Sequence, residues 1–118
     1  MFAKPDYTYR VTVDRVVDGD TVDVILDLGF HMTAHKRLRL LDLDTEELRD
    51  RDEERRAKGY KAKARMEDLL ESADAVYVKT IMDSTGKYGR LLAYLYIEKD
   101  NEFVNLNEQM VHEGFQKI

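Results

Sequence analysis

Residues 7–29 read YTYRVTVDRVVDGDTVDVILDLG, and their pattern of apolar and polar side chains decides the fold class. In two parts of this stretch every second side chain is apolar: first Tyr7, Tyr9, Val11 and Val13, then Val22, Val24, Leu26 and Leu28. Successive side chains of a strand point to opposite faces of a sheet, so a period of two indicates a half-buried strand. The segment between them, Val17-Asp18-Gly19-Asp20, has the residue types of a tight turn. The stretch therefore predicts two strands joined by a short connection.

The chain then continues with a strand, a helix and two more strands. Gly29 ends the second strand, and a third strand is predicted at about 36–43. From about 51 to 73 the period becomes helical, with an apolar stripe at Ala62, Met66, Leu69, Leu70 and Ala73. Residues 75–81 and 91–97 are strand-like, and the second of these runs, LLAYLYI, is apolar on both faces, as in a central strand.

A short helix is predicted at about 104–113, with Leu106, Met110 and Val111 as core candidates and Gly114 as its C-cap. The predicted order is thus β-β-β-α-β-β-α. Five strands with a helix inserted after the third are typical of an OB-fold, a five-stranded Greek-key barrel. We therefore expect a single α+β, mainly β, domain over residues 1–118, with one helix after strand 3 and a short C-terminal helix.

The composition excludes several kinds of site. The 118 residues are 43% hydrophobic and 36% charged and include no cysteine, so disulfides, thiolate catalysis and cysteine-ligated zinc are excluded. The three histidines, His31, His35 and His112, lack the spacing of an HExxH zinc motif. Any metal is therefore expected to be a hard cation with oxygen ligands.

The net charge of −5 argues against a protein that binds nucleic acid through a broad basic surface. An enzyme, however, needs positive charge only where the scissile phosphate lies. No stretch approaches the roughly 18 consecutive apolar residues that span a bilayer, so we expect no membrane contact. The start, MFAKPDYTYR, lacks the apolar run of a secretory signal, which leaves the cytoplasm and secretion after processing both open.

The segment Asp18-Gly19-Asp20-Thr21 has two interpretations. Asp-Gly is a common way to reverse a chain in a hairpin. Two aspartates beside a glycine can also offer carboxylate oxygens to a hard cation, although the pattern of an EF-hand is not in register here.

Residues 39–47, RLLDLDTEE, place an arginine in a strand and acidic side chains where that strand ends. The segment can be a strand that runs into a solvated acidic loop. Arg39 is flanked by apolar residues, however, and a half-buried guanidinium requires an anionic partner. Asp44, Glu47 or a bound phosphate can supply that negative charge.

The motif Lys87-Tyr88-Gly89-Arg90 leads directly into the apolar strand and, taken alone, is typical of a surface turn. Combined, the three motifs contain what phosphodiester hydrolysis needs: a divalent cation, a phosphate clamp and an activated water. The candidate groups are two carboxylates for one cation (Asp20, Asp44), two arginines for the phosphate (Arg39, Arg90) and one carboxylate for the water (Glu47).

Four segments in this order, VVDGDTVDV, RLLDLDTEE, KYGRLLAYLY and LNEQMVHEG, closely resemble those that define the staphylococcal nuclease family. The resemblance runs from about Arg10 to Ile118, with the helix in the expected place. It implies a calcium-dependent endonuclease that holds one calcium ion, cuts DNA and RNA and leaves 3′-phosphate ends. A monomer is expected.

The resemblance also implies a role for each matching residue. Asp20 and Asp44 correspond to the calcium-ligating carboxylates, and Thr45 to the residue that lends its backbone carbonyl. Glu47 matches the glutamate that acts as general base or orients the attacking water. The remaining matches concern the substrate: Arg39 and Arg90 bind the phosphate and stabilise the transition state, and Lys87 and Tyr88 contact the nucleotide phosphate.

Two departures from the family pattern affect these expectations. The family's DTPE reads Asp44-Thr45-Glu46-Glu47 here, so the proline that fixes one φ angle is absent and the loop that holds Glu47 is expected to be looser. The sequence also ends at Ile118, before the family's tyrosine-bearing segment and C-terminal helix, so we expect weaker grip on the base.

Two other classes of protein fit parts of the pattern. A non-catalytic module of the same fold binds nucleic acid or protein, but the presence of Arg39, Glu47 and Arg90 together favours the enzyme. A generic calcium-binding domain is disfavoured, because two arginines beside the cation would repel it unless a phosphate lay between them.

Overall fold

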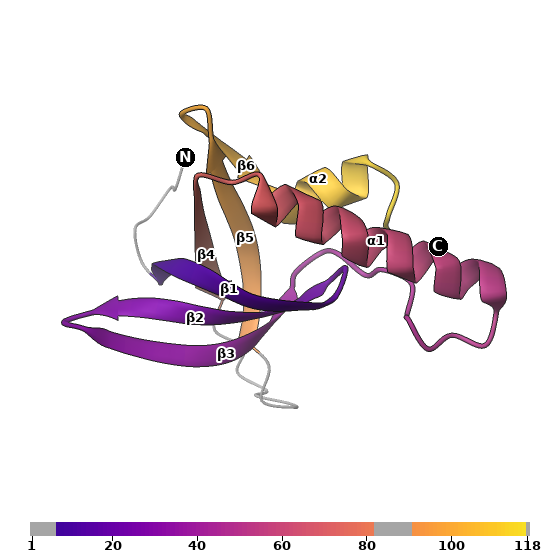
Figure 1. Cartoon of the computed structure of the whole chain (residues 1–118), viewed down its shortest axis with the longest axis horizontal. Helices are drawn as coiled ribbons and strands as arrows, with labels where there is room; N and C mark the ends of the chain where they lie inside the picture. The colour runs from indigo at the N-terminus through magenta and orange to yellow at the C-terminus, as the bar shows by residue number, and fades with distance from the viewer. Residues whose placement is uncertain (1–6, 82–90, 118) are drawn as a thin grey trace.

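A computed structural model describes residues 7–81 and 91–117. The first three strands, β1 (Thr8–Asp18), β2 (Thr21–Gly29) and β3 (Met32–Leu40), form the expected antiparallel meander (Figure 1). The third strand was expected at about 36–43, and this placement is wrong. It begins early because Phe30 and His31, both with positive φ, close the β2–β3 hairpin in two residues, and it ends early because Asp42 has a φ of 59°.

Helix α1 (Glu53–Glu71) begins where the sequence offers a cap. The Asp52 carboxylate accepts hydrogen bonds from the backbone N–H groups of Glu54 and Arg55, which have no partner within the helix. The predicted apolar stripe is confirmed: Ala62, Met66 and Leu70 are buried, and Leu69 and Ala73 pack against the core.

The second half contains β4 (Ala75–Ile81), β5 (Leu91–Lys99), β6 (Glu102–Asn105) and α2 (Leu106–His112). Strand β6 was not predicted; the expected helix began at 104, but Asn105 is the N-cap of α2 and the residues before it pair with β5. Gly114, with a φ of 91°, ends the α2 turn as expected. Of the helix core candidates, Leu106 and Met110 are buried, whereas Val111 is 41% exposed and is a wrong prediction.

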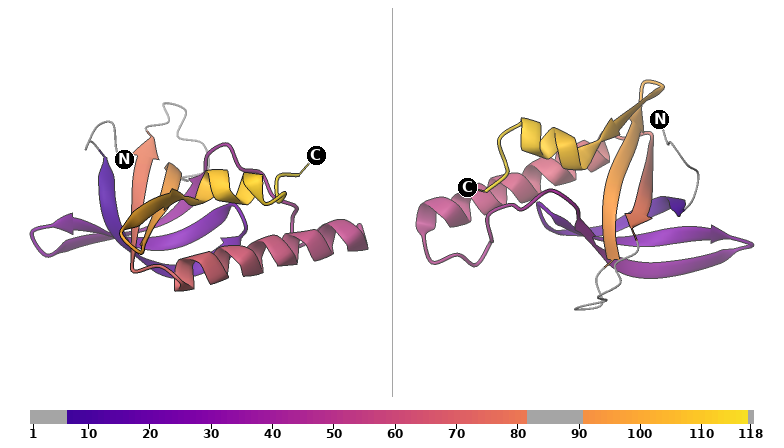
Figure 2. Two further views of the ribbon diagram at one scale, coloured as in Figure 1. Left: turned by 90° about the horizontal axis from the view of Figure 1, so that it is seen from above. Right: turned by 180° about the vertical axis from the view of Figure 1, so that it is seen from behind.

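The barrel closes where β3 and β5 pair in parallel, from Leu38 opposite Leu91 to Leu40 opposite Ala93. Strands β1 to β5 therefore form a closed five-stranded mixed barrel, and the expected OB-fold is confirmed. Figures 1 and 2 show both helices on the same side of this barrel, with α1 extending beyond it. Within the part of the chain that the structure describes, neither helix combines the length and apolarity needed to cross a membrane.

Candidate active site

A pocket of about 540 Å³ opens where the β1–β2 turn, the end of β3, residues 44–49 and α1 meet. Five predicted site residues line it: Asp20, Arg39, Asp44, Thr45 and Glu47. The topology thus brings together side chains that are up to 27 positions apart in the sequence. The other three predicted residues, Lys87, Tyr88 and Arg90, lie outside the described residues.

Asp20 is held rigidly at the β1–β2 turn, where it is only 7% exposed. One carboxylate oxygen accepts a hydrogen bond from the Thr21 hydroxyl at 2.9 Å, and the other accepts one from the Thr45 backbone N–H at 3.0 Å. The preceding residue must be glycine, because a Cβ at Gly19 would lie 2.8 Å from Cβ of Ala62 in α1. The close approach of α1 to this turn therefore fixes the Asp20 carboxylate beside residue 45.

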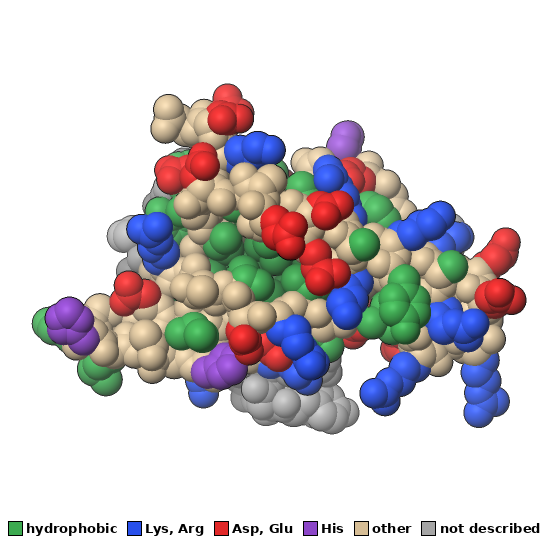
Figure 3. All heavy atoms as spheres, in the orientation of Figure 1, with side chains coloured by type: hydrophobic (Ala, Val, Ile, Leu, Met, Phe, Trp, Pro, Cys, Tyr) green, Lys and Arg blue, Asp and Glu red, His purple; other side chains and the backbone are tan. Residues whose placement is uncertain are grey.

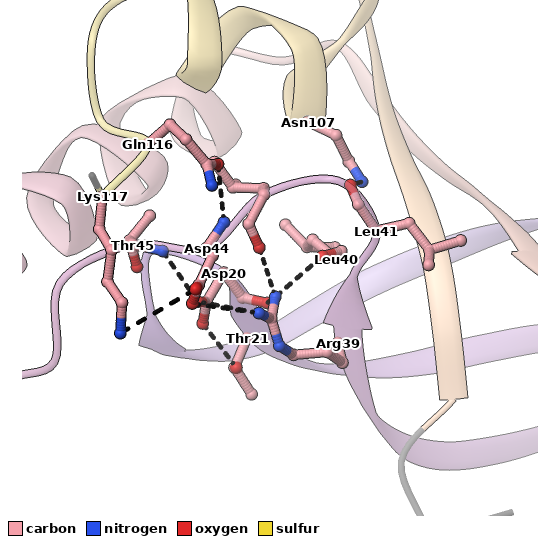
Figure 4. Close-up of polar contacts among 11 residues, drawn as sticks. Asp20, Thr21, Arg39, Leu40, Leu41, Asp44, Thr45, Asn107, Gln116 and Lys117 are labelled. Atoms are coloured by element: carbon pink, nitrogen blue, oxygen red, sulfur yellow. Dashed lines mark hydrogen bonds and ion pairs between the residues drawn. The ribbon is translucent and has the colours of Figure 1, made fainter. Parts of the chain in front are cut away.

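Arg39 extends from β3 into the pocket with its side chain 25% exposed. Its Nη1 donates to the backbone carbonyls of Leu40 at 2.9 Å and Leu43 at 2.6 Å, which fixes the plane of the guanidinium (Figure 4). Its Nη2 lies 3.5 Å from Oδ2 of Asp20 and 3.4 Å from Oδ1 of Asp44. The expected anionic partner is thus Asp44, joined by Asp20; no ion pair with Glu47 occurs within the described residues.

The backbone of Asp44 is held by the segment that follows α2. The Asp44 N–H donates to the Gln116 side-chain oxygen at 2.9 Å, and the Asp44 carbonyl accepts from the Lys117 N–H at 2.7 Å. The Lys117 ammonium also lies 4.0 Å from the Asp44 carboxylate. Figure 4 shows Gln116 and Lys117 reaching this loop, so the end of the described chain helps to position a predicted metal ligand.

Glu47 lies at the exposed edge of the pocket, on a loop whose backbone packs against α1. A Cβ at Gly59 would lie 2.7 Å from the Glu46 carbonyl oxygen and 3.0 Å from that of Glu47. This close contact explains why α1 keeps a buried glycine in its interior despite the cost in helix propensity. It also restrains the loop that lacks the family's proline.

Comparison with known proteins assigns the family. The family model described as staphylococcal nuclease homologue matches residues 37–118, which contain four of the five pocket residues that were predicted. The chain belongs to the staphylococcal nuclease family. The earlier resemblance is therefore confirmed, and two of its segments, VVDGDTVDV and RLLDLDTEE, contribute residues to the pocket.

Several known proteins are about equally similar to this chain. Endonuclease YncB of Bacillus subtilis is 31% identical over 109 residues, which cover 92% of this chain and 47% of that protein. A micrococcal nuclease of Shigella flexneri is 31% identical over 111 residues, which cover 90% and 56%. An uncharacterized protein of Methanocaldococcus jannaschii is 30% identical over 127 residues, which cover 93% and 59%. The chain thus spans about half the length of these three relatives.

The donor set of this nuclease-family pocket suits a hard cation. Asp20, Asp44 and the Thr45 carbonyl offer only oxygen ligands, as calcium prefers. Thr45 is 2% exposed, and its hydroxyl has no hydrogen-bond partner among the described residues, so one more buried oxygen is available beside the site. No group of three or more acidic or histidine side chains within the described ranges is arranged to hold a metal, so backbone oxygens and waters would have to complete the coordination.

Asp18 also lines the pocket, although the sequence motif singled out Asp20 instead. Burial raises the pKa of the Asp18 carboxyl, and the negative charges of Asp20 and Glu47 raise it further, while Lys63 and Arg37 oppose the effect. Carboxylates therefore repel one another across this pocket. A bound cation would relieve this repulsion, so the charge distribution of the pocket favours cation binding.

Proposed function

We propose that this protein is a calcium-dependent nuclease that hydrolyses phosphodiester bonds of DNA or RNA in the pocket beneath α1. One observation carries the proposal: the guanidinium of Arg39 lies within 3.5 Å of both the Asp20 and the Asp44 carboxylates, with Glu47 at the edge of the same pocket. Two similar relatives, the endonuclease YncB of Bacillus subtilis and the micrococcal nuclease of Shigella flexneri, support it by their names.

In this proposal Asp20, Asp44 and the Thr45 carbonyl hold one calcium ion. When bound, the ion supplies positive charge that polarises the phosphoryl oxygens and offsets the charge of the transition state. The rigid placement of Asp20 supports the assignment, because both of its carboxylate oxygens are already oriented by Thr21 and Thr45.

Arg39 binds a non-bridging oxygen of the scissile phosphate through its Nη2 edge, while the carbonyls of Leu40 and Leu43 hold Nη1 in place. A planar guanidinium fits a phosphate better than an ammonium does, since it presents two parallel N–H donors. Arg90 is proposed as the second phosphate clamp, with Lys87 and Tyr88 contacting the neighbouring nucleotide phosphate.

Glu47 accepts a proton from, or orients, the water that attacks phosphorus. Its exposed position suits this role, because the water must reach the phosphate from the solvent side. The new P–O bond forms as the bond to the 5′ oxygen breaks, and that oxygen leaves with a proton. The products are a 5′-hydroxyl and a 3′-phosphate end.

The experiment is incubation of the purified protein with single-stranded DNA in calcium, in magnesium and in excess chelator. We expect cleavage with 3′-phosphate ends in calcium and none in chelator. Magnesium should support much less cleavage, because it surrenders its waters reluctantly and demands octahedral geometry. If no condition gives cleavage while DNA still binds, the protein is instead a binding module that uses the same fold.

A further inference from the structure

Three further cationic side chains line the pocket, and each comes from a different part of the fold. Arg15 lies on β1, Arg49 on the loop between β3 and α1, and Lys63 on the barrel-facing flank of α1. None of the three forms an ion pair or a side-chain hydrogen bond with another residue in the ranges 7–81 and 91–117. We call Arg15, Arg49 and Lys63 the cationic rim.

Exposed cations elsewhere in the described chain, such as Arg10, Lys36 and Lys99, also lack ion pairs, but they do not line the pocket. Other cations have carboxylate partners. Arg37 pairs with Asp23 at 2.8 Å, and Arg65 pairs with Glu113 at 2.6 Å. The rim is distinguished by its place: its three cations line one opening without a direct ion pair, although the charge of Lys63 acts on Asp18 and that of Arg15 on Asp23. Figure 3 shows Lys and Arg side chains concentrated over the half of the molecule that carries α1.

The balance of charges inside the pocket indicates that the cationic rim binds an anion. Five carboxylates line it (Asp18, Asp20, Asp44, Glu46, Glu47), against the rim and Arg39, which leaves one net negative charge. A single bound divalent cation changes that balance to one net positive charge. The metal-loaded pocket therefore attracts an anion, and the unpaired rim extends the attraction beyond the place where one phosphate can sit.

We infer that Arg15, Arg49 and Lys63 bind the phosphates that flank the scissile one, so that the pocket selects a polynucleotide strand over a dinucleotide. The inference rests on the proposed function and identifies its preferred substrate class. Because the rim residues come from three elements around the opening, a strand that crosses the pocket can meet all three. A dinucleotide, which has one phosphodiester group, can occupy only the centre.

The test measures binding of a fluorescent 20-nucleotide single strand in calcium, in a Glu47→Gln background that keeps the DNA intact, over a series of salt concentrations. Each phosphate contact to single-stranded nucleic acid contributes a slope of about −0.7 to the dependence of log K on log salt. The triple variant Arg15→Gln/Arg49→Gln/Lys63→Gln should therefore show a slope shallower by about 2 and at least tenfold weaker binding at low salt. Binding of a labelled dinucleotide should change less than about twofold, because it lacks flanking phosphates.

The matched control is Arg10→Gln/Lys36→Gln/Lys99→Gln, which removes the same charge from exposed positions that do not line the pocket. Thermal unfolding verifies that both triple variants are folded, and the single variant Arg49→Gln repeats the test with minimal structural change. Equal slopes and affinities for rim and control variants would overturn the inference. Absence of cleavage by the parent protein would instead defeat the proposed function, and the binding data would still decide the role of the rim.

Discussion

Arg39 serves both the fold and the candidate site. Its position in the sequence, an arginine among apolar strand residues, predicted the need for an anionic partner, and the structure supplies Asp44 and Asp20. The contacts of Nη1 with the Leu40 and Leu43 carbonyls were not predictable, because they depend on how the chain turns at Asp42 after β3. Such backbone contacts leave no periodic signal in the sequence.

We predict that Arg39→Lys lowers both stability and cleavage. A lysine cannot satisfy the two backbone carbonyls and approach both carboxylates, so partly buried acceptors lose their donors. The free energy of unfolding should fall by about 1–3 kcal/mol in urea denaturation, and the cleavage rate should fall by more than tenfold. Arg37→Lys, an exposed ion-paired position on the same strand, is the control and should change both quantities less. Equal effects at the two positions would contradict the account.

Gly59 illustrates a residue whose role depends on tertiary structure. Taken as a helix residue, it is only unfavourable, by about 1 kcal/mol relative to alanine. In the structure it lets α1 lie directly against the Glu46 and Glu47 carbonyls, where a Cβ would be only 2.7 and 3.0 Å from their oxygens. No local pattern marks such a close approach.

Gly59→Ala should therefore destabilise the protein although it improves helix propensity. The added Cβ forces the Glu46–Glu47 backbone away from α1, at a cost of about 1–3 kcal/mol for overpacking. Urea unfolding and the cleavage rate in calcium are the measurements, and both values should fall. The reverse exchange Ala57→Gly, at an exposed position of α1, should cost only the propensity difference and leave cleavage unchanged. A more stable, fully active Gly59→Ala protein would contradict the close packing of Gly59 against the Glu46 and Glu47 carbonyls.

Helices and strands with a strong local pattern of apolar residues were predictable. An element that is defined only by its hydrogen bonds to a neighbouring strand was not. Strands β1 and β2 follow from alternation, α1 from the helical stripe and β5 from its continuous apolar run, all of which depend on local residue order alone, whereas β3 was misplaced. Strand β6 is four residues long, and only its pairing with β5 across the Asp100-Asn101 turn defines it. The hydrogen bond from the Asp44 N–H to the Gln116 side chain joins positions 72 residues apart, so no local sequence pattern could predict it.

The two helices are joined by an ion pair that should make stability depend on pH. Arg65 in α1 donates to the Glu113 carboxylate at the end of α2 at 2.6 and 2.9 Å. The Arg65 hydrogen bonds, followed by one from Gln109, hold the pKa of Glu113 below its ordinary value. A carboxyl whose pKa is lower in the folded state stabilises the fold above its ordinary pKa, and this stabilisation is lost as pH falls through the lowered value.

Glu113→Gln should thus reduce the free energy of unfolding at pH 7 by less than about 1 kcal/mol, since the pair is partly exposed. The difference from the parent protein should vanish at acidic pH, where Glu113 is protonated in both folded and unfolded states. Urea denaturation at both pH values provides the measurement. Glu108→Gln, an exposed position of α2, should show no comparable pH dependence. A difference that persists unchanged in acid would exclude the ion pair as its cause.

At the scale of the whole molecule, the barrel is a scaffold that brings distant segments to one opening. The β1–β2 turn supplies Asp20, the end of β3 supplies Arg39, the following loop supplies Asp44 and Glu47, and α1 packs over them. The order of the motifs along the sequence was sufficient to predict this gathering, because they resemble those of a known family. The cationic rim was not predictable, since Arg15, Arg49 and Lys63 belong to no common motif.

We propose that this pocket hydrolyses phosphodiester bonds with the help of calcium and Glu47. The most direct measurement compares the calcium-dependent rate of single-stranded DNA cleavage between the parent protein and Glu47→Gln, with circular dichroism to verify that both are folded. We expect cleavage by the parent protein that stops in chelator, and a rate about two orders of magnitude lower, or lower still, for Glu47→Gln. A folded parent protein that never cleaves DNA in calcium, or a Glu47→Gln variant that cleaves as fast, would contradict this proposal.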